Sequence, residues 1–225
     1  MGSALRTFAD VGNPDSFSNR MRNRRFQIFA GLLEPLPKPV RILDVGGTNL
    51  FWRQRGWADE NQDVRVTVVN LEAEAQEHEN IETASGDATS MPQFEDKSFD
   101  VVFSNSVIEH LFTWENQQKM AAEVRRIGKA YWVQTPNFWF PMEPHFHVPG
   151  WHWMPKSMRV ALLRRRQCGW RGPVKDKADA RRYVDEVRLM SKREMRKCFP
   201  EATIWGEKFY GLTKSWVARH GFDKS

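Results

Sequence analysis

The chain has 225 residues, of which 40% are hydrophobic and 28% are charged, with a formal net charge of +6. This length and composition fit one globular domain with a substantial core and exclude a largely disordered chain. No run approaches the roughly 18 apolar residues that cross a bilayer, and the polar start of the sequence lacks the apolar segment of a secretion signal. Cys168 and Cys198 are too few for a disulfide framework, so a reducing cytoplasm is the expected location.

Basic residues cluster at 20–25, 164–166 and 181–182. Such a balance suits nucleic acid, an anionic lipid surface or a phosphorylated substrate. Solvated helix faces give the same pattern, and the stretch after Arg181 mixes both signs as an exposed helix does. Charge alone therefore selects no partner.

The predicted elements alternate between helices and strands. A helix is expected over 16–33, ended by a proline-rich linker, and another over 114–127, where apolar residues recur at helical spacing. Short apolar runs predict five strands, at 41–45, 64–69, 81–85, 99–104 and 130–134. This alternation is typical of βαβ units and predicts a mainly parallel sheet.

The stretch 136–155 is dense in proline, aromatic residues and histidine, and we expect an ordered loop packed across the top of the sheet. The helices expected after it cover 156–167, 176–188 and 191–198. The last two strands, 202–208 and 215–219, are expected to form a hairpin with a loop over 209–214. The sequence thus predicts a single domain over 1–225, with an N-terminal helical segment (1–39) and a substrate-side insertion (136–200) before the last strands.

Glycines and polar residues follow the ends of the first four strands, where ligands bind in parallel sheets. They are Asp44, Gly46 and Gly47; Asn70 and Glu72; Gly86, Asp87 and Ala88; and Ser104, Asn105, Glu109 and His110. In order and spacing these turns resemble those of class I S-adenosylmethionine-dependent methyltransferases, over roughly 40–136. The tail from Leu189 is similar to the ending of small bacterial members. The resemblance implies an α/β, Rossmann-like, seven-stranded and mostly parallel sheet with helices on both faces, an antiparallel C-terminal hairpin, and S-adenosylmethionine as cofactor.

The resemblance also implies a role for each turn. Asp44, with Gly46 and Gly47, would hold the methionine end of the cofactor through its ammonium group. The chain departs from the family pattern at Thr48, where a further glycine is usual, which leaves the geometry of this turn open. The backbone under the sulfonium would come from Ser104 and Asn105.

The ribose and adenine contacts fall on the next two turns. The family usually has an acidic residue at the position of Asn70, so either Asn70 or Glu72 would reach the ribose hydroxyls. Asp87 would accept a hydrogen bond from the adenine amino group, with the amide of Ala88 nearby. Taken singly, Asn70 and Asp87 are equally explained as turn caps.

Methyl transfer is an in-line displacement, so positioning supplies much of the catalysis. A base is needed if the acceptor is a hydroxyl or a protonated amine, and histidine suits that role near neutral pH. The candidate catalytic residues are His110, His145, Glu109 and Glu143. For Glu109 and His110, a hydrogen-bonded pair that begins a helix and shapes the backbone is the favoured alternative.

Histidines at 145, 147 and 152 with Glu143 also suggest a metal set, but the prolines at 144 and 149 favour structural packing, and no metal is expected. Residues 136–145 look like a loop of methyltransferases in bacterial polysaccharide and secondary-metabolite pathways. Three tryptophans of this region either stack on a ring of the acceptor or fill the core: Trp139, Trp151 and Trp153.

The expected function is therefore methylation of a small-molecule acceptor, at a hydroxyl of a glycosyl, lipid-linked or secondary-metabolite substrate. Three alternatives stay open. An RNA or protein methyltransferase is favoured by the positive charge, although no RNA-binding appendage is recognisable. A nucleotide-dependent oxidoreductase is disfavoured, because the glycine fingerprint for a dinucleotide is missing. The altered first turn gives some support to a non-catalytic cofactor-binding module.

Overall fold

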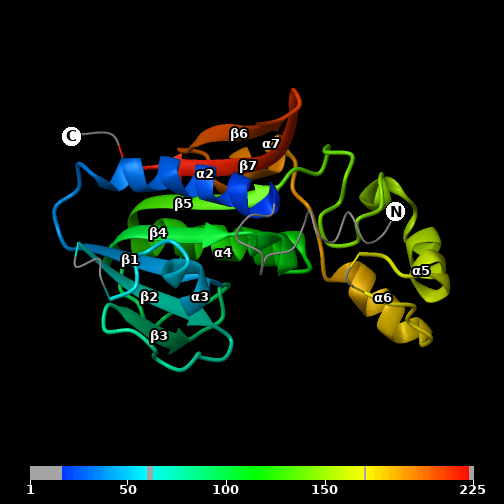
Figure 1. Ribbon diagram of the computed structural model, residues 1–225, viewed down its shortest axis with the longest axis horizontal. Coiled ribbons are helices and arrows are strands. Elements are labelled where there is room, and N and C mark those ends of the chain that lie inside the picture. The colour runs from blue at the N-terminus through cyan, green and yellow to red at the C-terminus, as the bar shows by residue number, and fades with distance from the viewer. Residues whose placement is uncertain (1–16, 60–62, 170, 223–225) are drawn as a thin grey trace.

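The computed structural model describes residues 17–59, 63–169 and 171–222, and its centre is a single seven-stranded sheet (Figure 1). The strands are β1 (Val40–Val45), β2 (Val64–Asn70), β3 (Ile81–Ser85), β4 (Phe99–Asn105), β5 (Gly128–Pro136), β6 (Thr203–Phe209) and β7 (Leu212–His220). Their order across the sheet is β3-β2-β1-β4-β5-β7-β6. The strand order reverses between β1 and β4, so ligands are expected at the carboxyl ends of these two strands.

The first five strands are parallel to one another, and β7 is antiparallel to both β5 and β6. The predicted sheet, mostly parallel with an antiparallel C-terminal hairpin, is confirmed. The predicted hairpin loop over 209–214 was too long. Tyr210 and Gly211 alone connect the strands, and both have left-handed φ angles (46° and 81°), as two-residue hairpin turns require. A tyrosine in that position gave no turn signal.

Helices cover both faces of the sheet, as predicted. They are α2 (Phe17–Leu33), α3 (Asn49–Arg53), α4 (Trp114–Ile127), α5 (Lys156–Arg165), α6 (Lys177–Asp185) and α7 (Lys192–Cys198), with short 3-10 helices η1 (Ile108–His110) and η2 (Trp151–Trp153). Alternate residues of each strand point to opposite faces: Ile42 packs with α2 and α3, and its neighbour Leu43 packs with α4 and α7. Fully burying an aliphatic side chain contributes roughly 1.5–3 kcal/mol, so the two faces together form the main core.

The helix α4 begins and ends as its sequence requires. The side chain of Thr113 accepts a hydrogen bond from the amide of Asn116 and caps the first turn. Met120, Val124 and Ile127 are fully buried on one side of the helix. The predicted bounds 114–127 are therefore confirmed.

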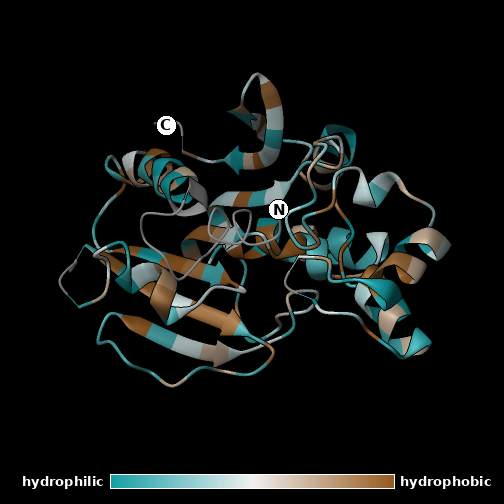
Figure 2. Cartoon of the chain, turned by 45° about the vertical axis from the view of Figure 1, so that its right-hand side comes forward, coloured by the Kyte–Doolittle hydropathy of each residue, from teal (hydrophilic) through white to brown (hydrophobic). Residues whose placement is uncertain are grey.

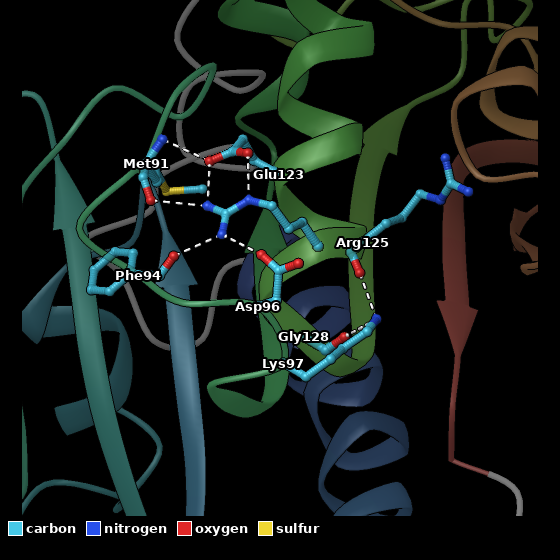
Figure 3. Close-up of polar contacts among 8 residues, drawn as sticks. Met91, Phe94, Asp96, Lys97, Glu123, Arg125 and Gly128 are labelled. Carbon is cyan, nitrogen blue, oxygen red and sulfur yellow. Dashed lines mark hydrogen bonds and ion pairs between the residues drawn. The ribbon is translucent and has the colours of Figure 1, made fainter.

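The connection between β3 and β4 is fixed to α4 by Arg126 (Figure 3). Its guanidinium donates hydrogen bonds to Glu123, to Asp96 and to the carbonyl oxygens of Met91 and Phe94. In the neighbouring turn, Lys97 donates to the carbonyl of Arg125 at the end of the helix. One side chain thus satisfies two loop carbonyls and two carboxylates, which makes Arg126 a local stabilising centre.

The stretch after β5 does not pack across the top of the sheet as expected. Together with α5 and α6 it forms a second, smaller core beyond the carboxyl ends of the strands, on the right of Figure 1. Phe146 stacks on Trp151 with ring centroids 4.2 Å apart, and both are buried together with Leu163 and Val184. These aromatic residues had enough apolar partners on α5 and α6 to make a core of their own. We call residues 141–187 the α5–α6 lobe; in Figure 2 it is the part to the right of the sheet.

The helix α7, at the end of the expected insertion, packs on α4 and on β6 and β7 instead of joining the lobe. Across the described ranges, no helix combines the length and apolar character needed to cross a membrane.

Candidate functional site

The first turn of the sheet, between β1 and α3, can be built only with glycine. Gly46 has φ = 76°, a left-handed conformation that L side chains rarely adopt, and its amide donates to the carbonyl of Val69 in β2. A Cβ at Gly47 would lie 1.7 Å from Oδ2 of Asp44. The backbone at Gly47 therefore lies directly against the carboxylate that the sequence assigns to the cofactor.

Asp44 itself is buried, with 1% of the residue exposed. Nε1 of Trp52 donates to its Oδ2 at 2.7 Å, and its Oδ1 has no hydrogen-bond partner among the described residues. Burial raises the pKa of Asp44 to about 7, although the bond from Trp52 lowers it. An orphaned buried carboxylate oxygen is well suited to a cationic ligand such as the cofactor's ammonium group. Sequence reasoning missed Trp52, because a tryptophan in a short helix reads as core.

The ends of β2 and β3 place the other predicted cofactor residues at the same edge. The side-chain amide of Asn70 donates a hydrogen bond to the carbonyl of Gly47, at 2.8 Å, and so supports the first turn. Glu72 is exposed and makes no hydrogen bond within the described ranges. Asp87 is also exposed, and its Oδ1 accepts bonds from the amide and hydroxyl of Thr89, as a turn cap does. The next residue after Asp87, Ala88, packs against the main core.

The carboxyl end of β4 is held from two directions. The hydroxyl of Ser104 donates to the carbonyl of Val45 at 3.0 Å and fixes β4 to β1. Oδ1 of Asn105 accepts a bond from Arg25 of α2, whose other nitrogen pairs with the buried Glu207 at 2.8 Å. Arg25 was not predicted as a site residue, because it lies in an arginine-rich stretch that looks solvated and its partners are 80 or more positions away.

The four predicted catalytic side chains meet beside this strand end, although they come from two separate segments. His110, in η1, and His145, in the loop after β5, have ring centroids 4.8 Å apart and nearly perpendicular planes. Glu143 is buried and accepts a bond from Nδ1 of His145 at 2.5 Å. Glu109 is fully buried; its Oε2 accepts from Thr135 at 2.9 Å, and its Oε1 has no partner among the described residues. We call Glu109, His110, Glu143 and His145 the acceptor cluster.

Burial and mutual charge set the protonation of the acceptor cluster. Burial raises the pKa of Glu109 to about 7, and it lowers the pKa of His110 to about 4 with the nearby charge of His145. For His145, burial alone would lower the pKa, but the hydrogen bond and charge of Glu143 outweigh it and raise the pKa above its ordinary value, with Glu109 adding to the effect. At neutral pH, His110 is therefore neutral, and Glu143 stabilises the protonated form of His145.

Glu109, His110 and His145 also offer metal-ligand atoms within 4.8 Å of one another. Atoms bound to one zinc ion lie roughly 3.5 Å apart, so the cluster would have to contract to hold one. Of the histidines considered for a metal from the sequence, His145 belongs to this group, whereas His152 lies between Phe138 and Trp153. The arrangement as it stands is better suited to handling a proton than to coordinating a cation.

The three tryptophans of this region divide between the two roles considered from the sequence. Trp151 is buried in the core of the lobe, whereas Trp139 and Trp153 are 65% and 47% exposed. Nε1 of Trp153 donates to the carbonyl of Phe138, which fixes its ring near Trp139. Only these two rings are free to contact a ligand.

Comparison with known proteins agrees with this geometry. Residues 53–130 match the family model described as the methyltransferase domain. Two strains of Mycobacterium tuberculosis each have an uncharacterized protein that is 34% identical over 71 residues, which are 32% of this chain and 24% of the relative. The chain thus spans about a quarter of the length of these curated relatives.

Solved structures share the fold at low sequence identity. The CurJ carbon methyltransferase superposes with a TM-score of 0.56 at 12% identity, over 96% of this chain and 57% of that one. The PH0226 protein of Pyrococcus horikoshii superposes with a TM-score of 0.51 at 16% identity, over 95% and 94%. The match over residues 53–130 and the observed strand order agree with the expected resemblance to the methyltransferase fold.

Proposed function

We propose that the chain, working as one domain, methylates a hydroxyl group of a small-molecule acceptor: a glycosyl, lipid-linked or secondary-metabolite substrate. The observation that carries the proposal is the acceptor cluster. Two carboxylates and two imidazoles converge next to the carboxyl end of β4, where the methyl group of the cofactor is expected. A hydroxyl acceptor loses a proton on methylation, and this cluster contains the groups that take one up.

The cofactor would be held by the residues at the strand ends. The orphaned oxygen of Asp44 suits the ammonium group, and the close approach of Gly47 leaves backbone free for the methionine end. Because Asn70 already supports the first turn, Glu72 is the better candidate for the ribose hydroxyls. Asp87 would turn from Thr89 to the adenine amino group. When bound, S-adenosylmethionine supplies an electrophilic methyl group on a sulfonium centre.

His145 is proposed as the base. Glu143 holds its Nδ1 and so leaves Nε2 for the acceptor, the arrangement by which a carboxylate orients a catalytic imidazole. On methyl transfer the acceptor oxygen would take the methyl group that the cofactor supplies, and the hydroxyl proton would pass to Nε2 of His145. Glu143 and Glu109 stabilise the resulting imidazolium. The neutral ring of His110 lies 4.8 Å from that of His145 and nearly perpendicular to it, and so would hold the His145 ring in position.

The test measures turnover and cofactor affinity separately. His145→Ala is expected to lower the turnover rate by about 10²- to 10⁴-fold, the usual contribution of a general base, and to leave the affinity for S-adenosylhomocysteine unchanged. His152→Ala, in the same loop but outside the cluster, is the matched control and should keep the wild-type rate. Release of S-adenosylhomocysteine is followed against a panel of hydroxylated glycosides and lipid-linked sugars.

Wild-type turnover in His145→Ala would contradict the role of His145 as base and would mean that positioning alone supports the transfer. Cofactor binding without turnover on any acceptor would favour the non-catalytic binding module, and turnover on RNA or protein alone would move the acceptor to those classes.

A further inference from the structure

The positive charge of the chain is concentrated in one part of the α5–α6 lobe. Residues 156–182 contain ten lysines and arginines and two aspartates, a net charge of +8, so the rest of the chain is net −2. This segment comprises α5, α6 for most of its length, and their connection. Figure 1 shows both helices on the right, away from the sheet. The basic character of the protein is therefore a local property of the lobe.

A cavity of about 530 Å³ opens between α5 and α6. Its apolar part comes from Val160 and Ala161 of α5. The other lining residues are Ser157 and four cations, namely Lys156, Arg164, Lys177 and Arg181. This volume lies within the roughly 300–1,000 Å³ of small-ligand sites, and an apolar floor below a cationic rim matches an amphiphile with an anionic head.

The rim has positive charge that the protein does not neutralise. Lys156 pairs with Asp185 at 2.5 Å, and Nε of Arg164 donates to the carbonyl of Lys175. Neither Lys177 nor Arg181 has a side-chain hydrogen bond or an acidic partner anywhere in 17–59, 63–169 or 171–222. Separated by four positions on α6, these two cations lie on one side of the helix. They are available to a phosphate group.

Exposed apolar side chains accompany the charge. Met158 of α5 is 55% exposed, and Trp153, just before α5, is 47% exposed. Exposed tryptophan and basic residues together are typical of surfaces that lie in the headgroup region of a bilayer. A surface for RNA would need aromatic faces to stack on bases, whereas Val160 and Ala161 give the cavity an aliphatic floor. The helix α5 has ten residues, too few to span a membrane, so it can only lie on one.

We propose that the α5–α6 cavity binds the phosphate headgroup of an anionic phospholipid and so docks the lobe on an anionic membrane surface. Glu143 and His145 of the acceptor cluster belong to the lobe, and the connection from α5 to α6 lies directly against them, because a Cβ at Gly169 would come 2.2 Å from the carbonyl oxygen of His145. Docking therefore brings lipid-linked acceptors to the acceptor cluster. This consequence rests on the proposed function, whereas the binding of lipid by the cavity is independent of it.

The experiment measures co-sedimentation of the full chain with vesicles, without cofactor or acceptor, so that its outcome is independent of turnover. Binding is expected to vesicles of phosphatidylcholine and phosphatidylglycerol in equal parts, to weaken with salt, and to be absent with phosphatidylcholine alone. Each basic residue near such a surface contributes about 1 kcal/mol, so Lys177→Gln with Arg181→Gln should weaken binding about thirtyfold. The matched control is Arg193→Gln with Lys197→Gln, two exposed cations at the same spacing on α7, which should bind like wild type.

A charge-reversed pair, Lys177→Glu with Arg181→Glu, should abolish binding, and circular dichroism of each variant checks its fold. Equal weakening in the α6 and α7 pairs would overturn the site, because non-specific charge would then explain the binding. So would a wild-type chain that ignores anionic vesicles and binds single-stranded RNA. Competition by glycerol phosphate at concentrations equal to the lipid would assign the cavity to a free phosphate ester and overturn membrane docking.

Discussion

The buried carboxyl group of Asp44 should make the stability of the fold depend on pH. Burial raises the pKa of Asp44 from 3.8 to about 7, and the residue is only 1% exposed. One pKa unit corresponds to about 1.4 kcal/mol, so holding the ionised group in the folded state costs about 4 kcal/mol relative to the unfolded chain. Because the folded pKa is the higher one, this cost is absent below pH 3.8, and the stability of the fold falls progressively as the pH rises to about 7.

The change that isolates this effect is Asp44→Asn, which keeps an oxygen for the bond from Trp52 and cannot ionise. Urea unfolding of wild type and variant is measured at a series of pH values. The difference between their free energies of unfolding cancels the other titrating groups, and it should move in favour of the variant by about 4 kcal/mol between acid and neutral pH and then level off.

A control of opposite sign is available in Asp100→Asn. Bonds from Lys129 and from the amide of Arg41 lower the pKa of Asp100 against the effect of its partial burial, so its contribution is lost as the pH falls. A pH-independent difference for Asp44→Asn would refute the assignment of a strained, buried carboxylate to the first turn. Saturating S-adenosylmethionine should flatten the curve of the wild type, because its ammonium group would stabilise the ionised carboxylate.

Two further predictions concern the acceptor cluster and the β3–β4 connection. His145 must be neutral to accept a proton, and Glu143 raises its pKa, so the turnover rate should fall on the acid side of a pKa above 6.5. Glu143→Gln should move this acid limb of the pH–rate profile to lower pH. The other charged groups that act on the ring, Glu109 and Arg171, are unchanged in this variant. A limb that stays in place in the rate profile would show that His145 is not the titrating base. Arg126→Ala should lower the free energy of unfolding in urea by about 2–3 kcal/mol, because three partly buried acceptors and the exposed Asp96 lose a charged donor. Its neighbour Arg125, which makes one surface pair with Glu201, should cost less than about 1 kcal/mol when changed to alanine, and equal effects of the two changes would contradict the network of Figure 3.

The sheet could be predicted because its strands carry their signal locally. β1, β2, β4 and β5 are short apolar runs buried on both faces, and α4 has both an N-cap and an apolar stripe. The resemblance of the turns gave the order in which the strands meet. The length of the hairpin loop was not predicted, because Tyr210 adopts a left-handed conformation in the two-residue turn that a tyrosine side chain does not favour.

The candidate site was predictable residue by residue but not as an arrangement. His110 and His145 stood out from the sequence as candidates, yet nothing in it showed that Glu143 would hold one ring and leave the other neutral. Contacts across 80 or more positions, such as Arg25 with Asn105, have no local pattern at all. The charge of the lobe was visible in the sequence, but its cavity depends on how α5 and α6 pack together.

The central claim is that four strand ends converge to bind one sulfonium nucleoside, and calorimetric titration with S-adenosylhomocysteine tests it most directly. Wild type should bind one equivalent. Asp87→Ala should bind about tenfold more weakly, the loss expected for about 1.4 kcal/mol, whereas Glu82→Ala, which removes an exposed carboxylate at the start of β3, should bind like wild type. A wild-type chain that takes up no S-adenosylhomocysteine, or equal affinity in all three proteins, would contradict the account.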